Sequence, residues 1–456
     1  MFENIIAQAA AGQLAEDIRS NRLAPSMLFF GPPASGKGSA ALELARALSC
    51  ENGAIDTAPA APWNCSCPAC LRHRCLIHGD LLLLGQRPFA AEIAASRTAF
   101  LREKTTATRT LFIRSLRKLT ARFSPVLWED DPKAGKFSPL LQSLEEALDE
   151  FESRSAALTG GAEADGAAME KLGDSLLKDA LKLEAEGMGE TIPIAQIRRA
   201  AYWSRLAPVG KHKTLIFENA DRMQEGARNS LLKILEEPPE AVSIILCVQR
   251  REAVLPTIAS RLRPYRFLKR EEEEEREIIR RVFRDSPARQ REGERQQAGG
   301  LVSAYIDSFF SQPLEKLYPL AAFFIASLAR SSALSFKKRG GDSIPAALTA
   351  LGAYCAPIAE AAGFGRSSTA REVIGTLLAE SDGFQARSFP RFLRLVLDLA
   401  AESIRQGEAG PHSIAYNDIW RNHINQAEAA AGVWNQNPTL VLESLFCRLQ
   451  EALALW

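Results

Sequence analysis

Short apolar runs alternate with helical patterns over residues 1–267 of the chain. The clearest runs are Ser26–Phe30, Thr214–Phe217 and Val242–Val248, each bounded by polar or turn-forming residues. Runs this short, each followed by a segment with the apolar spacing of a helix, are typical of buried strands. Because strands alternate with helices throughout, the pattern predicts a parallel, helix-covered sheet.

The pattern changes between residues 87 and 188, where three amphipathic stretches follow one another. Residues 97–122 carry eight Lys or Arg against one acid, whereas Ser138–Leu158 is acidic, and a third helix runs to about Leu183 after a glycine-rich break. The stretches predict an inserted helical hairpin. Either the basic and acidic helices pair with each other, or the basic helix binds DNA or a protein partner.

Everything after Leu268 has helical spacing. Glu271–Arg284 predicts a charged helix with Ile278, Ile279 and Val282 facing inward, and residues 389–404 and 416–456 predict further amphipathic helices. We therefore expect an α/β core over 1–267, followed by a part of the chain that is helical throughout.

The first predicted strand runs directly into a glycine-rich turn and then a helix. The turn spans residues 31–39 and has the phosphate-loop pattern in its required strand–loop–helix setting. In such a loop, backbone amides and the lysine hold phosphate groups. The candidate nucleotide-binding residues are Gly31, Pro32, Ser35, Gly36, Lys37, Gly38 and Ser39.

One position of this loop departs from the pattern. Gly38 follows the lysine where a Ser or Thr should bind Mg²⁺, and Ser39 stands one residue late, about 100° round the helix. The pattern predicts a P-loop fold and leaves open whether ATP and Mg²⁺ are bound.

The strand Thr214–Phe217 ends in polar residues, as a Walker B strand does. Ligands of open α/β sheets lie at this carboxyl edge. A Walker B strand places an Asp near Mg²⁺ and a Glu beside the attacking water, but here those positions hold Glu218 and Asn219. Glu218 is therefore also a candidate cofactor-binding residue. An amide nitrogen has no basic lone pair, so Asn219 cannot accept a proton. The segment therefore predicts a nucleotide-binding fold but lacks the residue that would accept a proton in catalysis.

Five of the eight cysteines fall between residues 50 and 75. Without a secretory signal, such a cluster indicates metal before disulfides. The spacing allows one tetrahedral, structural Zn²⁺, and Pro62 and Pro68 favour a loop. The expected ligands are Cys50, Cys65, Cys67 and Cys70, with Cys75, His73 and His78 in reserve. The alternative is a set of free thiols.

Composition excludes some classes of function. The net charge of the 456 residues is +1, which gives no overall electrostatic case for nucleic-acid binding. No apolar run approaches the ~18 residues of a membrane span, and no signal peptide is evident. We expect a cytoplasmic protein with no membrane partner.

The motifs, taken in order, resemble the clamp-loader branch of the AAA+ superfamily, and within it the delta-prime type of bacterial DNA polymerase III. The resemblance is carried by the P-loop, the cysteine knuckle, His78-Gly-Asp80, the Ile192–Arg198 helix, the 220–240 segment and the LPTIASR segment at 255–261. The resemblance implies that Arg261, preceded by Ser260, enters a neighbouring subunit's ATP site as an arginine finger. Leu262 departs from the family's Ser-Arg-Cys motif, and Cys65 stands one residue later than the knuckle pattern expects.

The resemblance also implies a function. We expect a non-hydrolysing, stator-like subunit, with an AAA+ core over 1–267, a helical lid over 268–312 and an all-helical collar domain over 313–456. Its implied partners are the tau/gamma and delta subunits, the sliding clamp and, through the complex, primer–template DNA. The alternatives are an ATP-hydrolysing tau/gamma-like motor subunit and a stand-alone DNA-binding protein. Gly38, Asn219 and the lack of an Arg near Gly300 argue against the motor, and the balanced charge argues against the DNA-binding protein.

Overall fold

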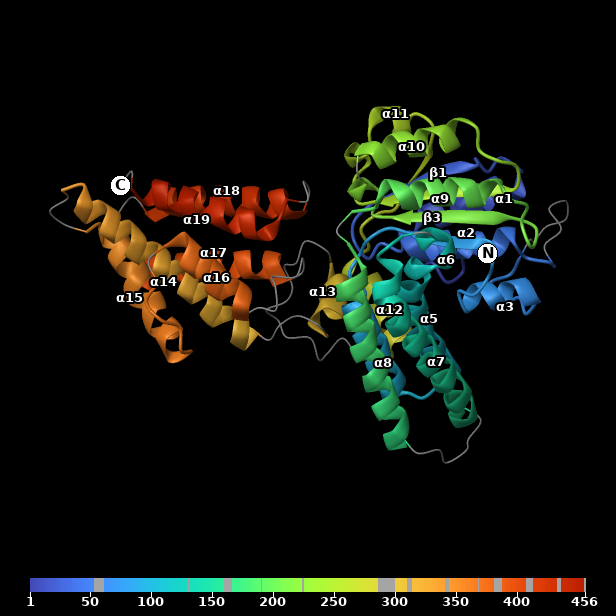
Figure 1. The fold of residues 1–456 in the computed structure, drawn as a ribbon, viewed down its shortest axis with the longest axis horizontal. Coiled ribbons are helices and arrows are strands. Elements are labelled where there is room, and N and C mark those ends of the chain that lie inside the picture. Colours follow the sequence, from blue (N-terminus) through green and yellow to red (C-terminus); the bar gives the residue numbers. More distant parts are fainter. Residues whose placement is uncertain are drawn as a thin grey trace. The chain divides into compact units, whose positions relative to one another are not determined.

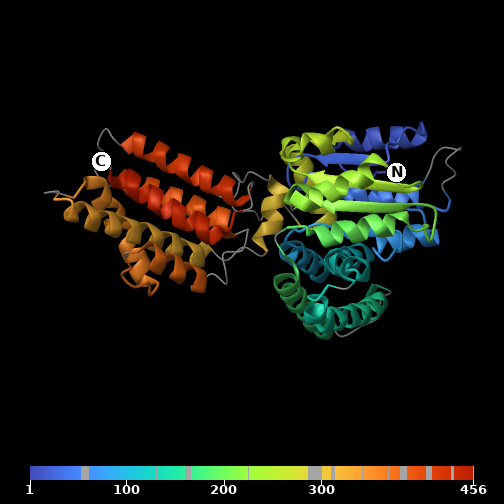
Figure 2. The same cartoon turned by 45° about the horizontal axis from the view of Figure 1, so that its top comes forward.

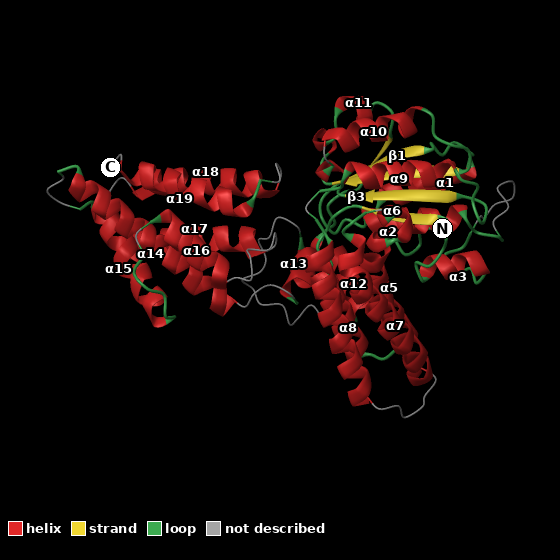
Figure 3. Ribbon diagram, viewed as in Figure 1, coloured by secondary structure: helices red, strands yellow, loops and turns green. Residues whose placement is uncertain are grey.

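The computed structural model describes residues 1–52, 61–129, 131–159, 166–189, 191–223, 225–285, 300–309, 314–340, 344–367, 369–380, 388–406, 413–432 and 436–454. The chain forms two compact units, Met1–Phe310 and Ser311–Trp456. The first combines an α/β core with an inserted helical bundle, and the second is helical (Figure 3).

The centre of the first unit is a five-stranded sheet in the order β2-β3-β4-β1-β5, and all of its pairings are parallel. The strands are β1 (Ser26–Phe30), β2 (Leu81–Leu84), β3 (Lys213–Glu218), β4 (Val242–Val248) and β5 (Arg263–Arg266). The predicted parallel sheet is therefore confirmed. Two of its strands, β2 and β5, were not predicted.

Helices cover both faces of this sheet because the strand residues alternate between two apolar cores. Leu215, Phe217 and their neighbours pack against α9, α10 and α11, whereas Met27, Phe29 and Ile216 pack against α1 and α2. The bounds are α1 (Ala9–Arg19), α2 (Lys37–Leu48), α9 (Ile194–Arg205), α10 (Glu225–Glu236) and α11 (Pro256–Ala259). The carboxyl ends of β1, β3 and β4 thus meet at one edge.

The insertion is a bundle of its own, with a hairpin of α7 and α8 extending to one side of the sheet (Figures 1 and 2). Its helices are α4 (Ala90–Arg102), α5 (Thr106–Thr120), α6 (Pro125–Trp128), α7 (Ala134–Thr159) and α8 (Gly166–Gly187). The single basic helix predicted over 97–122 is wrong: Thr105 starts a new helix with a capping box, so the stretch is divided between α4 and α5.

The basic and acidic stretches do pair, as the first of the two alternatives expected. Phe112 of α5 meets Phe151 of α7 edge to face at 5.1 Å between ring centroids, and Arg117 forms a 2.5 Å ion pair with Glu152. Arg97 of α4 likewise pairs with Asp174 of α8 at 2.6 Å. Much of the basic charge is therefore neutralised within the bundle.

Two helices, α12 (Glu272–Phe283) and α13 (Leu301–Ser308), complete the first unit. Ile279 and Phe283 of α12 are buried, but Val282, which was expected inward, is 36% exposed. Phe283, which lies four residues after Ile279 and therefore on the same face of the helix, is buried in place of Val282. A further short helix, α3 (Pro68–Arg74), lies in the cysteine segment, where a loop was expected; Cys67 is its N-cap and Pro68 its first residue.

The second unit is built around α14 (Leu314–Lys338), which packs against α15, α16, α17 and α19. Phe324 of α14 meets Phe392 and Phe446 edge to face at 5.7 and 5.5 Å. The remaining helices are α15 (Ala346–Ala361), α16 (Ala370–Glu380), α17 (Ser388–Gln406), α18 (Ser413–Gly432) and α19 (Pro438–Ala454).

One segment of α14 differs from the expectation that no apolar run approaches the length of a membrane span. Lys316–Lys338 is long and apolar enough, by composition, to cross a membrane. However, 72% of its most apolar window is buried, and residues such as Leu320 and Phe324 lie in the core of the second unit. Its apolar character is accounted for by packing between helices.

Candidate functional site

The predicted phosphate loop lies between β1 and α2. Gly36 has a φ of 93°, in the left-handed region, and α2 begins at the next residue, Lys37. The Lys37 ammonium donates hydrogen bonds to the carbonyl oxygens of Gly31 and Pro32, both at 2.6 Å, and to the Ser35 hydroxyl at 3.2 Å. Burial lowers the pKa of Lys37 to about 8. The lysine is thus satisfied by oxygens of its own loop.

Glu218, at the end of β3, is held by two arginines that come from the insertion. Arg87 Nε donates to Glu218 Oε2 at 2.8 Å, and Arg122 Nη2 donates to the same oxygen. Arg87 also pairs with Glu92 at 2.7 Å, which in turn pairs with Lys118 at 2.5 Å. The Walker B carboxylate is therefore part of a network of two acids and three cations.

The environment keeps this network ionised. Burial alone would raise the pKa of Glu218, but the neighbouring Arg87 and Arg122 hold that pKa below its ordinary value. The two guanidinium groups also lie over the buried Phe89 ring, at 4.1 and 5.5 Å from its centroid. A carboxylate with two guanidinium partners is poorly placed to bind a metal cation as well.

Gly38 and Glu218 are close neighbours. A Cβ placed on Gly38 would stand 2.7 Å from Glu218 Oε1, so the carboxylate takes the space of the side chain that the phosphate-loop pattern expects. Ser39 is exposed and does not replace it. Residue 38 therefore supplies no hydroxyl group on the side of the loop that faces Glu218.

Asn219 serves a structural contact at the position where a catalytic glutamate would stand. Its backbone is in the left-handed region, with a φ of 50°, which asparagine tolerates better than most residues. Its side-chain amide donates to the carbonyl oxygen of Gln86 at 2.8 Å. Asn219 thus ties the end of β3 to the segment after β2.

Arg270, just before α12, holds the phosphate loop from outside the sheet. Its Nη1 donates to Ala34 O at 2.7 Å, and its Nε donates to Ile6 O at 3.0 Å. A Cβ on Gly36 would meet the same guanidinium at 2.8 Å. Two cations thus donate hydrogen bonds to carbonyl oxygens of the phosphate loop: Lys37, which belongs to the loop, and Arg270, which precedes α12.

Arg261 lies away from this edge, directly after α11. It is 36% exposed, donates to Thr257 O at 2.6 Å, and forms a 2.8 Å ion pair with Glu236 at the end of α10. Ser260 is exposed beside it and donates to Thr257 O at 3.1 Å. An exposed guanidinium with one exposed acidic partner can be presented to another molecule.

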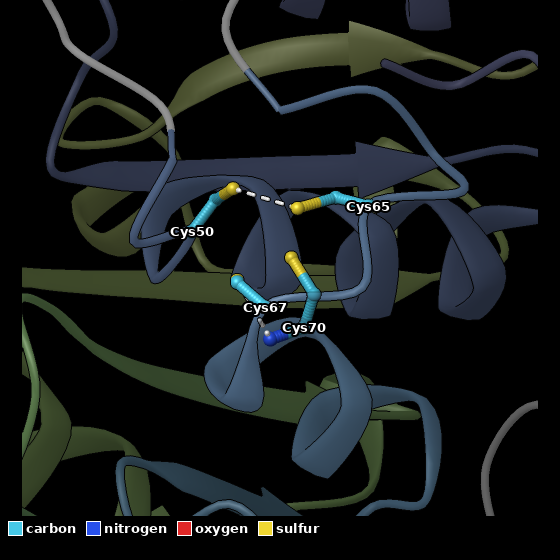
Figure 4. Close-up of side chains that lie close together, drawn as sticks. All are labelled: Cys50, Cys65, Cys67 and Cys70. Atoms are coloured by element: carbon cyan, nitrogen blue, oxygen red, sulfur yellow. Dashed lines mark hydrogen bonds between the residues drawn. The ribbon is translucent and has the colours of Figure 1, made fainter.

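The four expected metal ligands converge. The sulfur atoms of Cys50, Cys65, Cys67 and Cys70 all lie within 4.8 Å of one another, and each residue is buried (Figure 4). The Cys50 and Cys65 sulfurs are 3.7 Å apart. Tetrahedral zinc with Zn–S bonds of about 2.3 Å would separate its sulfurs by about 3.8 Å. The donor set and its dimensions therefore fit zinc.

Arg46 and a backbone amide contact the cluster sulfurs and favour the thiolate form, although burial raises the pKa of Cys70. Arg46 Nη1 donates to Cys70 Sγ at 2.9 Å, and the Cys70 amide donates to Cys67 Sγ at 3.5 Å. The reserve residues lie outside the set: His73 and His78 stack on each other, with ring centroids 4.1 Å apart, and Cys75 ends α3. With four sulfurs bound, a zinc ion would keep no open position for water, as in a structural site.

Comparisons with known proteins agree with the motifs. A family model described as DNA polymerase III, delta subunit, matches residues 163–271. The DNA polymerase III subunits gamma/tau of Mycobacterium bovis and Mycobacterium tuberculosis are 36% identical to this chain over 90 residues. These comparisons support the clamp-loader family.

The matches cover limited parts of the proteins. The 90 residues are 20% of this chain and 15% of each gamma/tau protein. A solved DNA polymerase III gamma subunit-related protein from Thermotoga maritima is 20% identical and covers 58% of this chain and 81% of its own, with a TM-score of 0.29. The family-model match includes Glu218, Asn219 and Arg261 but excludes the phosphate loop and the cysteine cluster.

Three arginines of the site were not identified from the sequence. Arg122 was counted only as one charge of a basic stretch, Arg87 only marked the start of the insertion, and Arg270 was not singled out. Their side chains are largely buried against Glu218 and the phosphate loop. An arginine followed closely by a buried aromatic, as in Arg87-Pro-Phe89, is the one local signal for such burial, and it is weak.

Proposed function

We propose that this chain is a non-hydrolysing, stator-like subunit of a DNA polymerase III clamp loader, of the delta-prime type. In this proposal residues 1–267 are the AAA+ core, 268–312 the lid and 313–456 the collar. The chain works in the cytoplasm with tau/gamma and delta subunits, and it helps to place a sliding clamp on primer–template DNA.

The observation that carries the proposal is the state of Glu218. Its carboxylate is bound by Arg87 and Arg122 and lies against Gly38. ATP hydrolysis in P-loop proteins needs a hydroxyl and an acid on Mg²⁺ and a group that positions the attacking water. Here the hydroxyl is missing, the acid is neutralised, and Asn219 is bound to Gln86 O.

Within this proposal, Arg261 acts in trans, on ATP that is bound by a neighbouring subunit. An arginine finger neutralises charge that develops on the transferred phosphoryl group. The exposure of both Arg261 and Glu236 supports this role, since a solvent-exposed ion pair can exchange for a contact with phosphate.

A reconstituted complex tests the proposal. We expect the purified chain to lack ATPase activity, and Lys37→Ala in this chain to leave the ATPase of the whole complex unchanged. Turnover by the isolated chain that disappears on Lys37→Ala would overturn it.

The second candidate is an ATP-hydrolysing gamma/tau-like subunit, which the identity to gamma/tau proteins favours. The same measurement separates the two, because a motor subunit would lose its turnover with Lys37. Binding of ATP without turnover is compatible with the first proposal and would appear as Lys37-dependent binding in a complex with unchanged ATPase.

A further inference from the structure

The insertion, the phosphate loop and the two helices α12 and α13 share one apolar cluster. Its buried members are Ala95 and Ala99 of α4, Ile279 and Phe283 of α12, and Val302 and Tyr305 of α13. Ala34, at the tip of the phosphate loop, packs against the same cluster, as does Leu111 of α5. Three parts of the chain that are distant in sequence are therefore buried against one another.

Polar contacts reinforce this cluster at the end of α12. Arg102 Nη1 donates to Phe283 O at 2.9 Å and to Arg284 O at 3.2 Å, and its Nη2 pairs with Asp285 Oδ2 at 2.7 Å. The Tyr305 hydroxyl donates to the same Asp285 oxygen at 3.0 Å. A cation at the last carbonyls of a helix is stabilising, so Arg102 both caps α12 and attaches it to α4.

The pair of helices α4 and α5 is also attached to the sheet, at the end opposite Arg102. Arg87 and Arg122, which flank α4 and α5, bind Glu218 at the end of β3. Midway along α5, Arg114 donates to Arg74 O at 2.7 Å, which joins the bundle to the last turn of α3. The α4–α5 pair thus contacts the sheet edge, the cysteine segment and α12–α13 together.

From these contacts we infer that α4 and α5 form an internal brace that keeps α12 and α13 fixed against the phosphate loop whether or not nucleotide is present. The inference deepens the proposed function, since it relies on residues 31–39 being the nucleotide loop. A helical pair that follows nucleotide binding must be able to move relative to the loop. Here its movement would break the Ala34 packing and the Arg102 contacts, so the pair is held in one position.

Hydrogen exchange of the full chain, measured by mass spectrometry on peptides of α12 and α13, tests the brace. In the wild type, ATP with Mg²⁺ should change exchange in Leu301–Ser308 by less than about twofold. Arg102→Ala should speed exchange there about tenfold, since hydrogen bonds from a charged donor and an ion pair are lost. Peptides of β1 and β4 should be unchanged in that variant.

Two further variants keep the result interpretable. Tyr305→Phe removes a single hydroxyl and should speed α13 exchange about fivefold, which also serves if Arg102→Ala fails to fold. Arg281→Ala, which removes an exposed guanidinium of α12 that is ion-paired with Glu277, is the matched control and should change nothing. Nucleotide-dependent exchange of α12–α13 in the wild type would overturn the brace, as would wild-type exchange in both brace variants. ATPase turnover with a fixed α12–α13 pair would instead contradict only the proposed function.

Discussion

Glu218 Oε1 stands 2.7 Å from the point where a Cβ on Gly38 would be. The two departures from an active phosphate-loop site are therefore linked in space. The carboxylate is fixed in this position by Arg87 and Arg122, and the absence of a side chain at residue 38 makes room for it. Within the proposed function, the missing hydroxyl at residue 38 and the neutralised carboxylate are thus two parts of one rearrangement.

This relationship predicts that Gly38 tolerates no side chain. Gly38→Ala should lower the free energy of unfolding by about 1–3 kcal/mol, because its methyl group would displace a carboxylate held by two arginines. Gly12→Ala is the matched control: Gly12 lies inside α1 with open space around its Cβ, so the change should stabilise by about 0.5–1 kcal/mol. Urea unfolding of both variants measures the difference, and equal effects would contradict the prediction.

A second prediction concerns the pH dependence of stability. The cations beside Glu218 and Glu92 hold the pKa of both carboxyls below their ordinary values, against the effect of burial. A carboxyl with a lowered folded-state pKa stabilises the protein above its unfolded pKa of about 4.3, and this stabilisation is lost as pH falls through the folded value. We therefore expect stability to fall steeply below about pH 4.

The variant Glu218→Gln isolates this contribution from that of the cysteine cluster. At pH 7 it should be less stable than the wild type by about 3–5 kcal/mol, because Arg122 and Arg87 lose the carboxylate that they share. The difference should shrink as pH falls below about 4, where the carboxyl of the unfolded wild-type chain becomes neutral while the folded one still has to be protonated. Glu273→Gln, at an exposed acid of α12, serves as control. A difference that stays constant from pH 7 to pH 3 would exclude the ion pairs as its source.

The central strands and the phosphate loop could be predicted because each depends on local pattern. β1, β3 and β4 are almost wholly buried, so each contains an uninterrupted apolar run: Met27–Phe30, Leu215–Phe217 and Ile244–Val248. β5 was missed for the opposite reason: it is an edge strand, and in Arg263–Arg266 only Tyr265 is buried. β2 is as apolar as the others but is only four residues long, too short to separate from a loop by pattern alone.

The charged part of the site could not be predicted. Arg87, Arg122 and Glu218 come together only through the packing of the insertion on the sheet edge. In a sequence, an arginine in an amphipathic stretch has the pattern of an exposed residue, whether or not it is buried. The convergence of the four cysteine sulfurs, in contrast, could be expected from the sequence, because three of these residues lie within six positions of one another in the chain.

The geometry of this cluster predicts stoichiometric zinc. Metal analysis of protein purified without chelator should find about one zinc per chain, and Cys67→Ser with Cys70→Ser should remove it and lower the thermal stability of the first unit. Cys75→Ser is the control, since Cys75 lies in the same segment but outside the four-sulfur group. Zinc retained by the double variant, or lost in the control, would show that other ligands hold the metal.

The prediction about Arg261 tests whether this chain completes the active site of another subunit. Its contacts are an exposed ion pair with Glu236 and a bond to Thr257 O, and exposed pairs contribute about 0.2–1 kcal/mol. Arg261→Ala should therefore fold and assemble normally. Its effect should appear in the partner subunit's ATPase, since a trans arginine contributes about 10³–10⁵ in rate in comparable phosphoryl-transfer systems.

Two comparisons separate a catalytic arginine from a surface one. Arg251→Ala removes an exposed guanidinium from the short 3-10 helix Arg251–Ala253, which precedes α11 in the chain, and should leave the ATPase and clamp loading of the reconstituted complex unchanged. Glu236→Gln removes the acid that pairs with Arg261, so it should preserve or raise the partner's turnover if the guanidinium leaves that acid to reach a phosphate. Arg261→Lys should restore little, because an ammonium lacks the planar fork that binds two oxygens. If Arg261→Ala and Arg251→Ala give the same ATPase activity, Arg261 is a surface residue that pairs with Glu236 and has no part in catalysis.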